Sequence, residues 1–396
     1  MARISIVTSG HISTNPRVWR EADALAAGGH EVTVIGVCID PKQAEIDQQM
    51  LSKRSWVYQA AADLRGHSLW HRSRAQLGRT LLATNIHDPH ALGYAVDRLL
   101  NSATKQRGEL TICHLEVALW VGTKLRQRGF RVGVDIEDWY SESGADTNLP
   151  RKRFLRSLEQ KILSRTVHAT TTSHAMADAL SADYKCRKPE VIYNSVPSFA
   201  ECGLTQRVGP VRLIWFSQRV GRDRGLQDVF GALPLLQGNW TLELRAEASA
   251  EMCDWVKSQV IPELRSRVRI EPTVPPEQLS HVVAKCDIGL APESPSCRNK
   301  ALTVSNKMFQ YLQSGLLVAA SDTRGQQEIL ELFPEGGRLY PSGNVGALAS
   351  VLNSWLVDAE KTRQSNGSIA RGANVRFGYE HQARSLLETV GEALES

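Results

Sequence analysis

Residues 3–36 read RISIVTSGHISTNPRVWREADALAAGGHEVTVIG, and this stretch predicts a strand, a helix and a second strand. The apolar runs Ile4–Val7 and Val32–Ile35 have the length and β-branched composition of buried strands. Asn15 is a favourable N-cap, Pro16 suits the first helical position, and Gly28 ends the helix. The polar loop before the helix therefore brings a helix N-terminus to the carboxyl end of a strand, where such sheets bind ligands.

The same alternation of strand and helix continues through the chain. Strands are predicted in the first half at Leu110–Cys113, Arg131–Val134, Val167–Thr171 and Glu190–Tyr193, and in the second at Arg212–Phe216, Thr241–Arg245, Arg267–Ile270, Asp287–Ala291 and Leu317–Ala320. The stretches between these strands carry apolar residues at helical spacing. Residues 39–82 are the least regular part of the first half. The pattern indicates an α/β fold with a doubly wound parallel sheet in each half.

A segment without periodicity, containing Pro, Gly and Ser, separates the two halves. We predict an N-terminal domain of residues 1–194, a linker of residues 195–210 and a C-terminal domain of residues 211–376. Residues 377–396 are predicted as a final amphipathic helix.

The composition indicates a protein of a reducing compartment. The seven cysteines are scattered and form no Cys-x-x-Cys pair. We see no signal peptide and no apolar run of the ~18 residues that a membrane span needs. The net charge of +5 is mild and leaves polyanions, anionic membrane surfaces and phosphorylated small molecules open as partners. We expect a cytoplasmic protein without a nucleic-acid partner, and a peripheral position on the inner face of the cytoplasmic membrane stays open.

Three predicted helix starts combine a polar loop with a cation. Gly10 and Arg17 flank the first, Arg219 and Arg224 flank the second, and Lys307 lies in the first turn of the third. A lysine at the positive end of a helix dipole is unfavourable unless an anion binds there. Each start also fits an ordinary capped helix with a solvated cation, but the three together favour a diphosphate ligand.

Two other nucleotide-binding classes lack their motifs here. No Gly-x-Gly-x-x-Gly follows a strand, and there is no Gly-Lys-Ser/Thr P-loop. These absences argue against a nicotinamide dehydrogenase and a P-loop NTPase.

With these motifs in this order, the chain resembles the GT-B fold glycosyltransferases, specifically the large retaining group that uses nucleotide-sugar donors. NPRVWREADALAAGGHEVTVIG is similar to the family's opening unit, Arg219 and Arg224 keep the spacing of its diphosphate-binding Arg and Lys, and SNKMFQYLQSGLLVAASDTRGQQEI resembles its Pro-Asn-Lys-x-x-Glu-Tyr element. The resemblance covers nearly the whole chain. It implies two facing Rossmann-like domains, with the acceptor on the first, the donor on the second and the final helix crossing back to the first.

The resemblance also implies site residues, all on the donor side. The ligands of the donor diphosphate would be Gly10, Arg17, Arg219, Arg224 and Lys307. The ligands of the donor sugar or nucleoside would be Glu293, Asn306 and Gln310, with Arg298 and Asn299 nearby. The expected substrate is a UDP- or GDP-type nucleotide sugar, with no cofactor and no metal, since there is no Asp-x-Asp motif.

Two departures from the family pattern bear on mechanism. Gln310 replaces a glutamate that holds the ribose in relatives, and Leu302 stands eight residues earlier in place of a second one. In VDIEDWYSES, Glu137 replaces a histidine. The resemblance implies retention by front-face displacement, whereas Glu137 or Asp138 as general base would suit an inverting enzyme. His114 ends another predicted strand, and its position fits either a structural or a catalytic role.

Basic stretches of the first half suggest where an acceptor or a membrane could bind. His71, Arg72, Arg74 and Arg79 lie close together in sequence. Residues 149–163 predict an amphipathic helix with a basic start, which suits either ordinary packing or anionic lipid. By analogy with the family, we expect a saccharide or lipid-linked acceptor and a role in polysaccharide or glycoconjugate assembly.

Two alternatives remain. A GT-B-fold nucleotide-sugar epimerase would bind the same donors and needs acid and base groups, for which Glu137, Asp138 and Glu293 are candidates. A degenerate protein that binds nucleotide sugars without turnover would also retain Arg219, Arg224 and Lys307.

Overall fold

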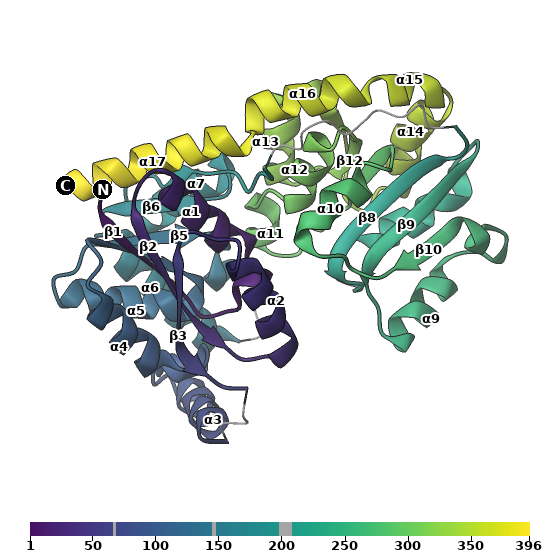
Figure 1. The fold of residues 1–396 in the computed structure, drawn as a ribbon. Helices are drawn as coiled ribbons and strands as arrows, with labels where there is room; N and C mark the ends of the chain where they lie inside the picture. The colour runs from purple at the N-terminus through teal and green to yellow at the C-terminus, as the bar shows by residue number, and fades with distance from the viewer. Residues whose placement is uncertain (66–68, 145–147, 198–207) are drawn as a thin grey trace. The chain divides into compact units, whose positions relative to one another are not determined.

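The computed structural model describes residues 1–65, 69–144, 148–197 and 208–396. These residues form two compact units, each built on one sheet (Figure 1). The first unit comprises residues 1–193 and 382–396, and the second comprises residues 194–381. Of the linker expected at 195–210, residues 198–207 lie outside the described part.

The first unit contains a seven-stranded parallel sheet in the order β3-β2-β1-β4-β5-β6-β7. The strand order reverses on either side of β1, so the sheet is doubly wound. Its strands are β1 (Arg3–Thr8), β2 (Glu31–Cys38), β3 (Val57–Asp63), β4 (Leu110–His114), β5 (Val132–Ile136), β6 (His168–Thr171) and β7 (Glu190–Val191).

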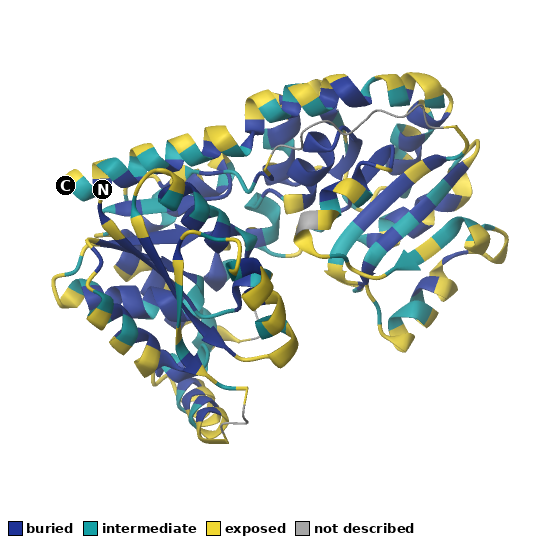
Figure 2. Cartoon of the chain, viewed as in Figure 1, coloured by how far each residue is buried: buried dark blue, intermediate teal, exposed yellow. Residues whose placement is uncertain are grey.

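The helices of the first unit connect these strands in sequence order. They are α1 (Pro16–Ala27), α2 (Pro41–Leu51), α3 (Leu69–Ala83), α4 (Val96–Gln106), α5 (Leu115–Gln127), α6 (Leu149–Leu163) and α7 (His174–Tyr184). Strands β1, β4 and β5 are almost wholly buried, as parallel strands covered on both faces must be (Figure 2).

The second unit repeats this plan with a six-stranded parallel sheet in the order β10-β9-β8-β11-β12-β13. Its strands are β8 (Val211–Arg219), β9 (Trp240–Glu247), β10 (Val268–Glu271), β11 (Ile288–Ala291), β12 (Leu317–Ser321) and β13 (Gly337–Tyr340). Its helices are α8 (Leu226–Ala232), α9 (Ala250–Gln259), α10 (Pro276–Val283), α11 (Arg298–Leu302), α12 (Asn306–Gln313), α13 (Arg324–Leu332), α14 (Val345–Leu356), α15 (Ala359–Gln364) and α16 (Asn366–Phe377).

The last helix, α17 (Tyr379–Glu395), contributes most of its length to the first unit. The Gln382 Oε1 atom accepts a hydrogen bond from the Tyr193 N–H at 2.8 Å, and the Leu394 carbonyl accepts one from Arg131 Nη1 at 2.6 Å. Leu386 and Val390 are buried. The first unit therefore consists of two pieces of chain that are distant in sequence.

The predicted fold class is confirmed, and a strand lies at every range where the sequence predicts one. Two strands were not predicted, β3 and β13, and both lie at an edge of their sheet. Residues 39–82, the least regular part of the first half in sequence, contain α2, β3 and nearly all of α3. Among the described residues, no helix has the length and apolar character needed to cross a membrane.

Candidate functional site

The polar loop after β1 is held by α2. His11 Nδ1 lies 2.6 Å from Asp47 Oδ2, and its Nε2 accepts hydrogen bonds from the backbone N–H groups of residues 39 and 40, each at 2.9 Å. Because Nε2 is an acceptor, the proton must sit on Nδ1, where it is donated to Asp47. As predicted, Asn15 caps α1, with its Oδ1 accepting from the Arg17 and Val18 N–H groups at 3.1 and 3.3 Å.

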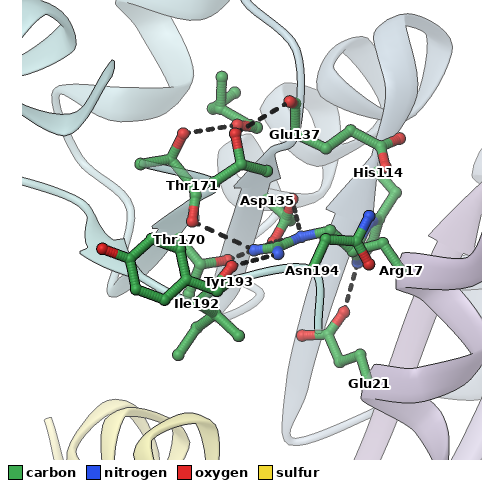
Figure 3. Close-up of polar contacts among 12 residues, drawn as sticks. Arg17, Glu21, His114, Asp135, Glu137, Thr170, Thr171, Ile192, Tyr193 and Asn194 are labelled. Atoms are coloured by element: carbon green, nitrogen blue, oxygen red, sulfur yellow. Dashed lines mark hydrogen bonds and ion pairs between the residues drawn. The ribbon is translucent and has the colours of Figure 1, made fainter. Parts of the chain in front are cut away.

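The side chain of Arg17 is buried and fully engaged within the first unit (Figure 3). Its Nε and Nη2 atoms form a two-pronged ion pair with Asp135, at 2.9 Å to Oδ1 and 2.6 Å to Oδ2. It also donates to the Ile192 carbonyl and, at 3.3 Å, to that of Thr171. The sequence analysis expected Arg17 to meet a donor phosphate. This geometry corrects that expectation, since each of the three side-chain nitrogens of Arg17 donates to an acceptor of the protein.

A row of polar residues crosses the carboxyl ends of four neighbouring strands. Thr8 on β1 is paired in register with His114 on β4, His114 with Asp135 on β5, and Asp135 with Thr170 on β6. The Thr170 hydroxyl donates to Asp135 Oδ2 at 2.5 Å. Burial opposes ionisation of Asp135, but the Arg17 guanidinium outweighs it and lowers the pKa of Asp135.

His114 is fully buried and its Nε2 is hydrogen-bonded to Glu21 Oε2 of α1 (Figure 3). Burial by itself lowers the pKa of His114, but the Glu21 carboxylate overcomes that effect and raises it to about 9. Within the described part of the chain, His114 Nδ1 and Glu21 Oε1 are buried without a hydrogen-bond partner. A buried ion pair explains His114 as a structural residue, and no exposed ring atom supports contact with a substrate.

Glu137 follows β5 directly and is half-buried, whereas Asp135 and Glu21 are buried. Asn15 Nδ2 donates to Glu137 Oε1 at 2.8 Å. Burial raises the pKa of Glu137 to about 7, assisted by Asp135 and Asp138 and opposed by His114. A carboxylate that titrates near neutral pH is suited to general base chemistry. Asp138, the next residue, is exposed.

A second buried carboxylate fixes the segment that carries Glu137 and Asp138. Glu159 on α6 accepts from the Ser141 N–H at 2.9 Å and from the Tyr184 hydroxyl at 2.5 Å. The Trp139 indole in turn donates to the Tyr184 hydroxyl at 2.9 Å. Burial raises the pKa of Glu159 to about 7, although these hydrogen bonds oppose the rise. Sequence reasoning missed Glu159, because a glutamate among basic residues on a helix has no local signal of burial.

Gly10 leaves space above the first loop. A Cβ at this position would meet only Leu115 Cδ1 at 3.5 Å and Thr14 Oγ1 at 3.9 Å, both ordinary contact distances. The protein itself therefore does not require glycine there, and a role in admitting a ligand stays a prediction.

The polar residues of the second unit gather where β8, β11 and β12 end. The strand order of this sheet reverses at β8, so β8 and β11 flank its switch point. Ligands of doubly wound sheets bind outside the carboxyl ends of the strands at such points. The loops that follow these strands carry Arg224, Glu293 and Thr323.

We call Arg224, Glu293, Ser305 and Lys307 the second-unit cluster. Lys307 Nζ donates to Glu293 Oε1 at 2.7 Å, and the Ser305 hydroxyl donates to the same oxygen at 3.0 Å. Lys307 Nζ also lies 5.7 Å from the centre of the Trp215 ring. Burial opposes ionisation of Glu293, but Lys307 and, more weakly, Arg224 lower its pKa. Two cations therefore act on one carboxylate at the switch point.

Two features of the cluster leave hydrogen-bond donors unused by the protein. Ser305 is the N-cap residue of α12, yet its side chain makes no capping bond. Arg224 Nε is buried and makes no hydrogen bond among the residues described; its only recorded ion pair is 3.8 Å from Asp223. Free donors at a helix N-terminus attract anions.

A glycine brings the two loops of the cluster together. Gly225 has φ +70°, and a Cβ there would collide with the Pro292 carbonyl oxygen. Arg224 precedes this glycine and Glu293 follows that proline, so the contact sets their spacing. Arg219, at the end of β8, is exposed.

The residues expected to contact the donor sugar and nucleoside differ in how far they are buried. Gln310 is buried, and its Nε2 donates to Ser280 Oγ of α10 at 2.6 Å, which argues against a ribose contact. Asn306 is exposed, and its Oδ1 accepts from Asn194 Nδ2 at 2.8 Å. Asn299 is buried and Arg298 is exposed, both on α11.

The basic start of α6 is neutralised by neighbouring acids. Arg151 pairs with Glu116, and Lys152 pairs with Glu142 at 3.1 Å. The apolar face of the helix is buried, including Phe154 and Leu158. This helix therefore packs as an ordinary surface helix and does not offer the free basic and apolar face that lipid binding requires. Among the residues that the structure describes, no group of three or more His, Cys, Asp or Glu side chains is placed to hold a metal ion.

Comparison with known proteins shows what the chain resembles. Residues 14–195 match the family model described as "Glycosyl transferase 4-like domain". HepE of Anabaena, crystallised with UDP and glucose, has a TM-score of 0.73 and 16% identity over 99% of this chain and 100% of its own. TarM of S. aureus has a TM-score of 0.74 and 10% identity over 100% of this chain and 99% of its own.

Sucrose-phosphate synthase of Thermosynechococcus elongatus has a TM-score of 0.70 and 17% identity over 99% of both chains. A search of characterised proteins by sequence finds no significant match. The predicted resemblance is confirmed at the level of the fold, which is the GT-B fold. The similarity of residues 14–195 to a glycosyl transferase 4-like domain supports glycosyl transfer as the class of reaction.

Proposed function

We propose that this protein transfers a sugar from a nucleoside-diphosphate sugar to a saccharide or lipid-linked acceptor. The observation that carries the proposal is the second-unit cluster, in which Lys307 and Arg224 act on one carboxylate at the switch point of the sheet. Cations fixed beside a helix N-terminus stabilise a diphosphate, both when it is bound and when it leaves. We assign the diphosphate to Lys307, Arg224 and Arg219, and the sugar or nucleoside to Glu293 and Asn306.

UDP is the first nucleotide to test, because HepE was crystallised with UDP and with UDP-glucose. We propose that the diphosphate is neutralised by these side chains without a metal. Support comes from the two cations of the cluster and from the unused Arg224 Nε donor.

We assign the acceptor to the first unit, with Glu137 as the group that accepts a hydrogen bond from its hydroxyl. Retention of the anomeric configuration is supported by the resemblance of the motifs to the retaining group. The raised pKa of Glu137, about 7, also suits a general base of an inverting enzyme. The configuration of the first-formed product, read by proton NMR, decides between these outcomes.

We further propose that the protein attaches to the anionic inner face of the cytoplasmic membrane through α3, as expected for an enzyme of polysaccharide assembly. Leu69, Trp70 and Leu77 are exposed on this helix to 75%, 62% and 52%. Arg72 and Arg79 are also exposed, and the helix contains no acidic residue. Exposed apolar side chains beside basic ones on a helix suit an anionic lipid surface.

Donor binding tests the core of the proposal. Titration calorimetry of the wild-type protein against UDP, GDP, ADP and dTDP should give heat with one of them. Replacing Lys307 or Arg224 by alanine should each weaken that binding by about 1.5–3 kcal/mol, since each removes a charge-assisted hydrogen bond. The matched control is Arg222→Ala, because Arg222 is 62% exposed and pairs at the surface with Glu251.

Binding of no nucleotide, or equal affinity in the two variants and the control, would refute the assignment. Turnover of the donor without acceptor, giving an altered sugar nucleotide, would instead identify an epimerase. Binding without turnover with any acceptor would identify a non-catalytic nucleotide-sugar protein.

A further inference from the structure

Lys307 has a protein counter-ion at the place where the proposed function requires a phosphate. Its Nζ lies 2.7 Å from Glu293 Oε1, and the two side chains are only 10% and 19% exposed. The Ser305 hydroxyl donates to that same oxygen, at 3.0 Å, instead of capping α12. One carboxylate oxygen therefore accepts from both of these side-chain donors at the start of α12.

The groups that face Glu293 come from several elements of the second unit. Lys307 and Ser305 belong to α12 and its N-cap, and Arg224 belongs to the turn before α8. Two tyrosines are also close enough to feel the carboxylate: Tyr311, whose hydroxyl donates to the Leu290 carbonyl at 3.2 Å, and Tyr340, whose hydroxyl donates to Asp228 at 3.2 Å. Both tyrosine hydroxyls are thus directed to other acceptors, and Lys307, Ser305 and Arg224 stabilise the negative charge of Glu293.

We propose that Glu293 is the internal counter-ion of the donor site, displaced from Lys307 by the donor diphosphate and neutralised by uptake of one proton from solvent. This inference rests on the proposed function. The proton balance is simple, because the carboxylate takes up one proton to become a carboxylic acid and no other bond is formed or broken. The resulting hydroxyl can donate to a phosphate oxygen, so the same residue changes from competitor to ligand.

Repulsion between like charges at close range is the reason why Glu293 takes up a proton when the donor binds. A nucleotide sugar brings two negative charges to Lys307 and Arg224, and a partly buried carboxylate beside them then loses its stabilising cations. Two anions in one partly buried place do not both stay ionised when one of them can take up a proton. The diphosphate of a nucleotide sugar has no proton to take up near neutral pH, so Glu293 must do so.

The affinity for UDP-glucose is therefore expected to rise as the pH falls from 8 to 5.5, by up to tenfold for each unit over part of that range. UDP-glucose is the right probe, since free UDP has a terminal phosphate that titrates within this range. Calorimetry at one pH in two buffers of different ionisation enthalpy should show uptake of up to one proton for each donor bound.

Glu293→Gln tests the source of that proton. The variant keeps the shape of the side chain but not its charge, so it should bind UDP-glucose more tightly than wild type at pH 8, with no proton uptake and no pH dependence. Glu251→Gln removes an exposed carboxylate of the same unit and should behave as wild type. Glu137→Gln should retain the uptake, because Glu137 belongs to the first unit.

A measurement on the wild-type protein tests the same inference if Glu293→Gln does not fold. Infrared difference spectra of the wild-type protein should show one protonated carboxyl band appearing when UDP-glucose is added. Binding of UDP-glucose without proton uptake, or uptake that persists in Glu293→Gln, would overturn this inference and leave the proposed function intact. Failure of UDP-glucose and every other nucleotide sugar to bind would overturn both.

Discussion

Arg17 shows how one contact decides between two roles for a residue. On the sequence alone it is a cation at a helix start, where a phosphate would fit. In the structure it compensates the buried charge of Asp135 at 2.6 Å, a partner 118 positions away in sequence. Such a pair has no local signature, so the sequence could identify Arg17 as important but not assign its role.

Removing Arg17 should therefore cost stability. Arg17→Ala leaves Asp135 buried without its cation, which should lower the free energy of unfolding by about 3–5 kcal/mol. Urea denaturation followed by circular dichroism measures the loss. The control is Arg65→Ala, which breaks the exposed pair between Arg65 and Asp63 and should leave the midpoint nearly unchanged. Equal midpoints for the two variants would contradict the structural role of Arg17.

Glu137 predicts the pH dependence of transfer. Its pKa of about 7 means that the carboxylate is progressively protonated as the pH falls below that value. If the ionised form accepts the acceptor proton, kcat should fall about tenfold for each pH unit below 7 and level off above it. Glu137→Gln should lower kcat and remove this dependence. An unchanged pH profile in Glu137→Gln would show that another group is responsible.

At the scale of elements, every central strand could be predicted, whereas two of the four edge strands, β3 and β13, could not. β4 reads LTICH and is wholly buried, so its apolar run is a strong signal. β3 reads VYQAAAD and is mostly exposed or half-buried, and β13 is only the four residues GRLY. Edge strands are stabilised by pairing on one side and need fewer apolar residues, which leaves the sequence with little to show.

The turn between β8 and α8 depends on Gly225. Gly225→Ala would combine an unfavourable positive φ with a collision against the Pro292 carbonyl, and we expect it to displace Arg224 and weaken UDP binding at least tenfold. Gly343→Ala is the matched control, since Gly343 has φ +83° but no atom near its missing Cβ. Calorimetry on both variants separates the close contact from the backbone strain. Equal binding by the two would contradict this role of the turn.

If α3 attaches the protein to the membrane, replacing two of its exposed apolar residues should strongly weaken the attachment. Trp70→Ser with Leu77→Ser should reduce binding to vesicles containing anionic lipid by at least tenfold in a sedimentation assay, because both side chains are exposed. Arg153→Gln on α6 should leave binding unchanged, since the apolar face of that helix is buried. Wild-type protein that does not sediment with anionic vesicles would refute the attachment.

At the scale of the whole molecule, the two units divide the chemistry. The donor residues that we propose, Arg219, Arg224 and Lys307, all belong to the second unit. Hydrogen exchange should therefore slow on addition of UDP in the turn at residues 219–226 and in the first turn of α12. In the absence of acceptor, exchange in the sheet of the first unit should stay unchanged. Protection confined to the first unit would place the donor site there instead.

The return of α17 to the first unit has a consequence for synthesis. Residues 382–396 leave the ribosome after the whole of the second unit, yet they supply the buried Leu386 and Val390 and the acceptor for the Tyr193 N–H. Domains generally form as units while the chain is made, from the N-terminus onward. Here the first unit must wait until the second has been synthesised, so a nascent chain that stalls within the second unit leaves the first one incomplete and its apolar surface uncovered.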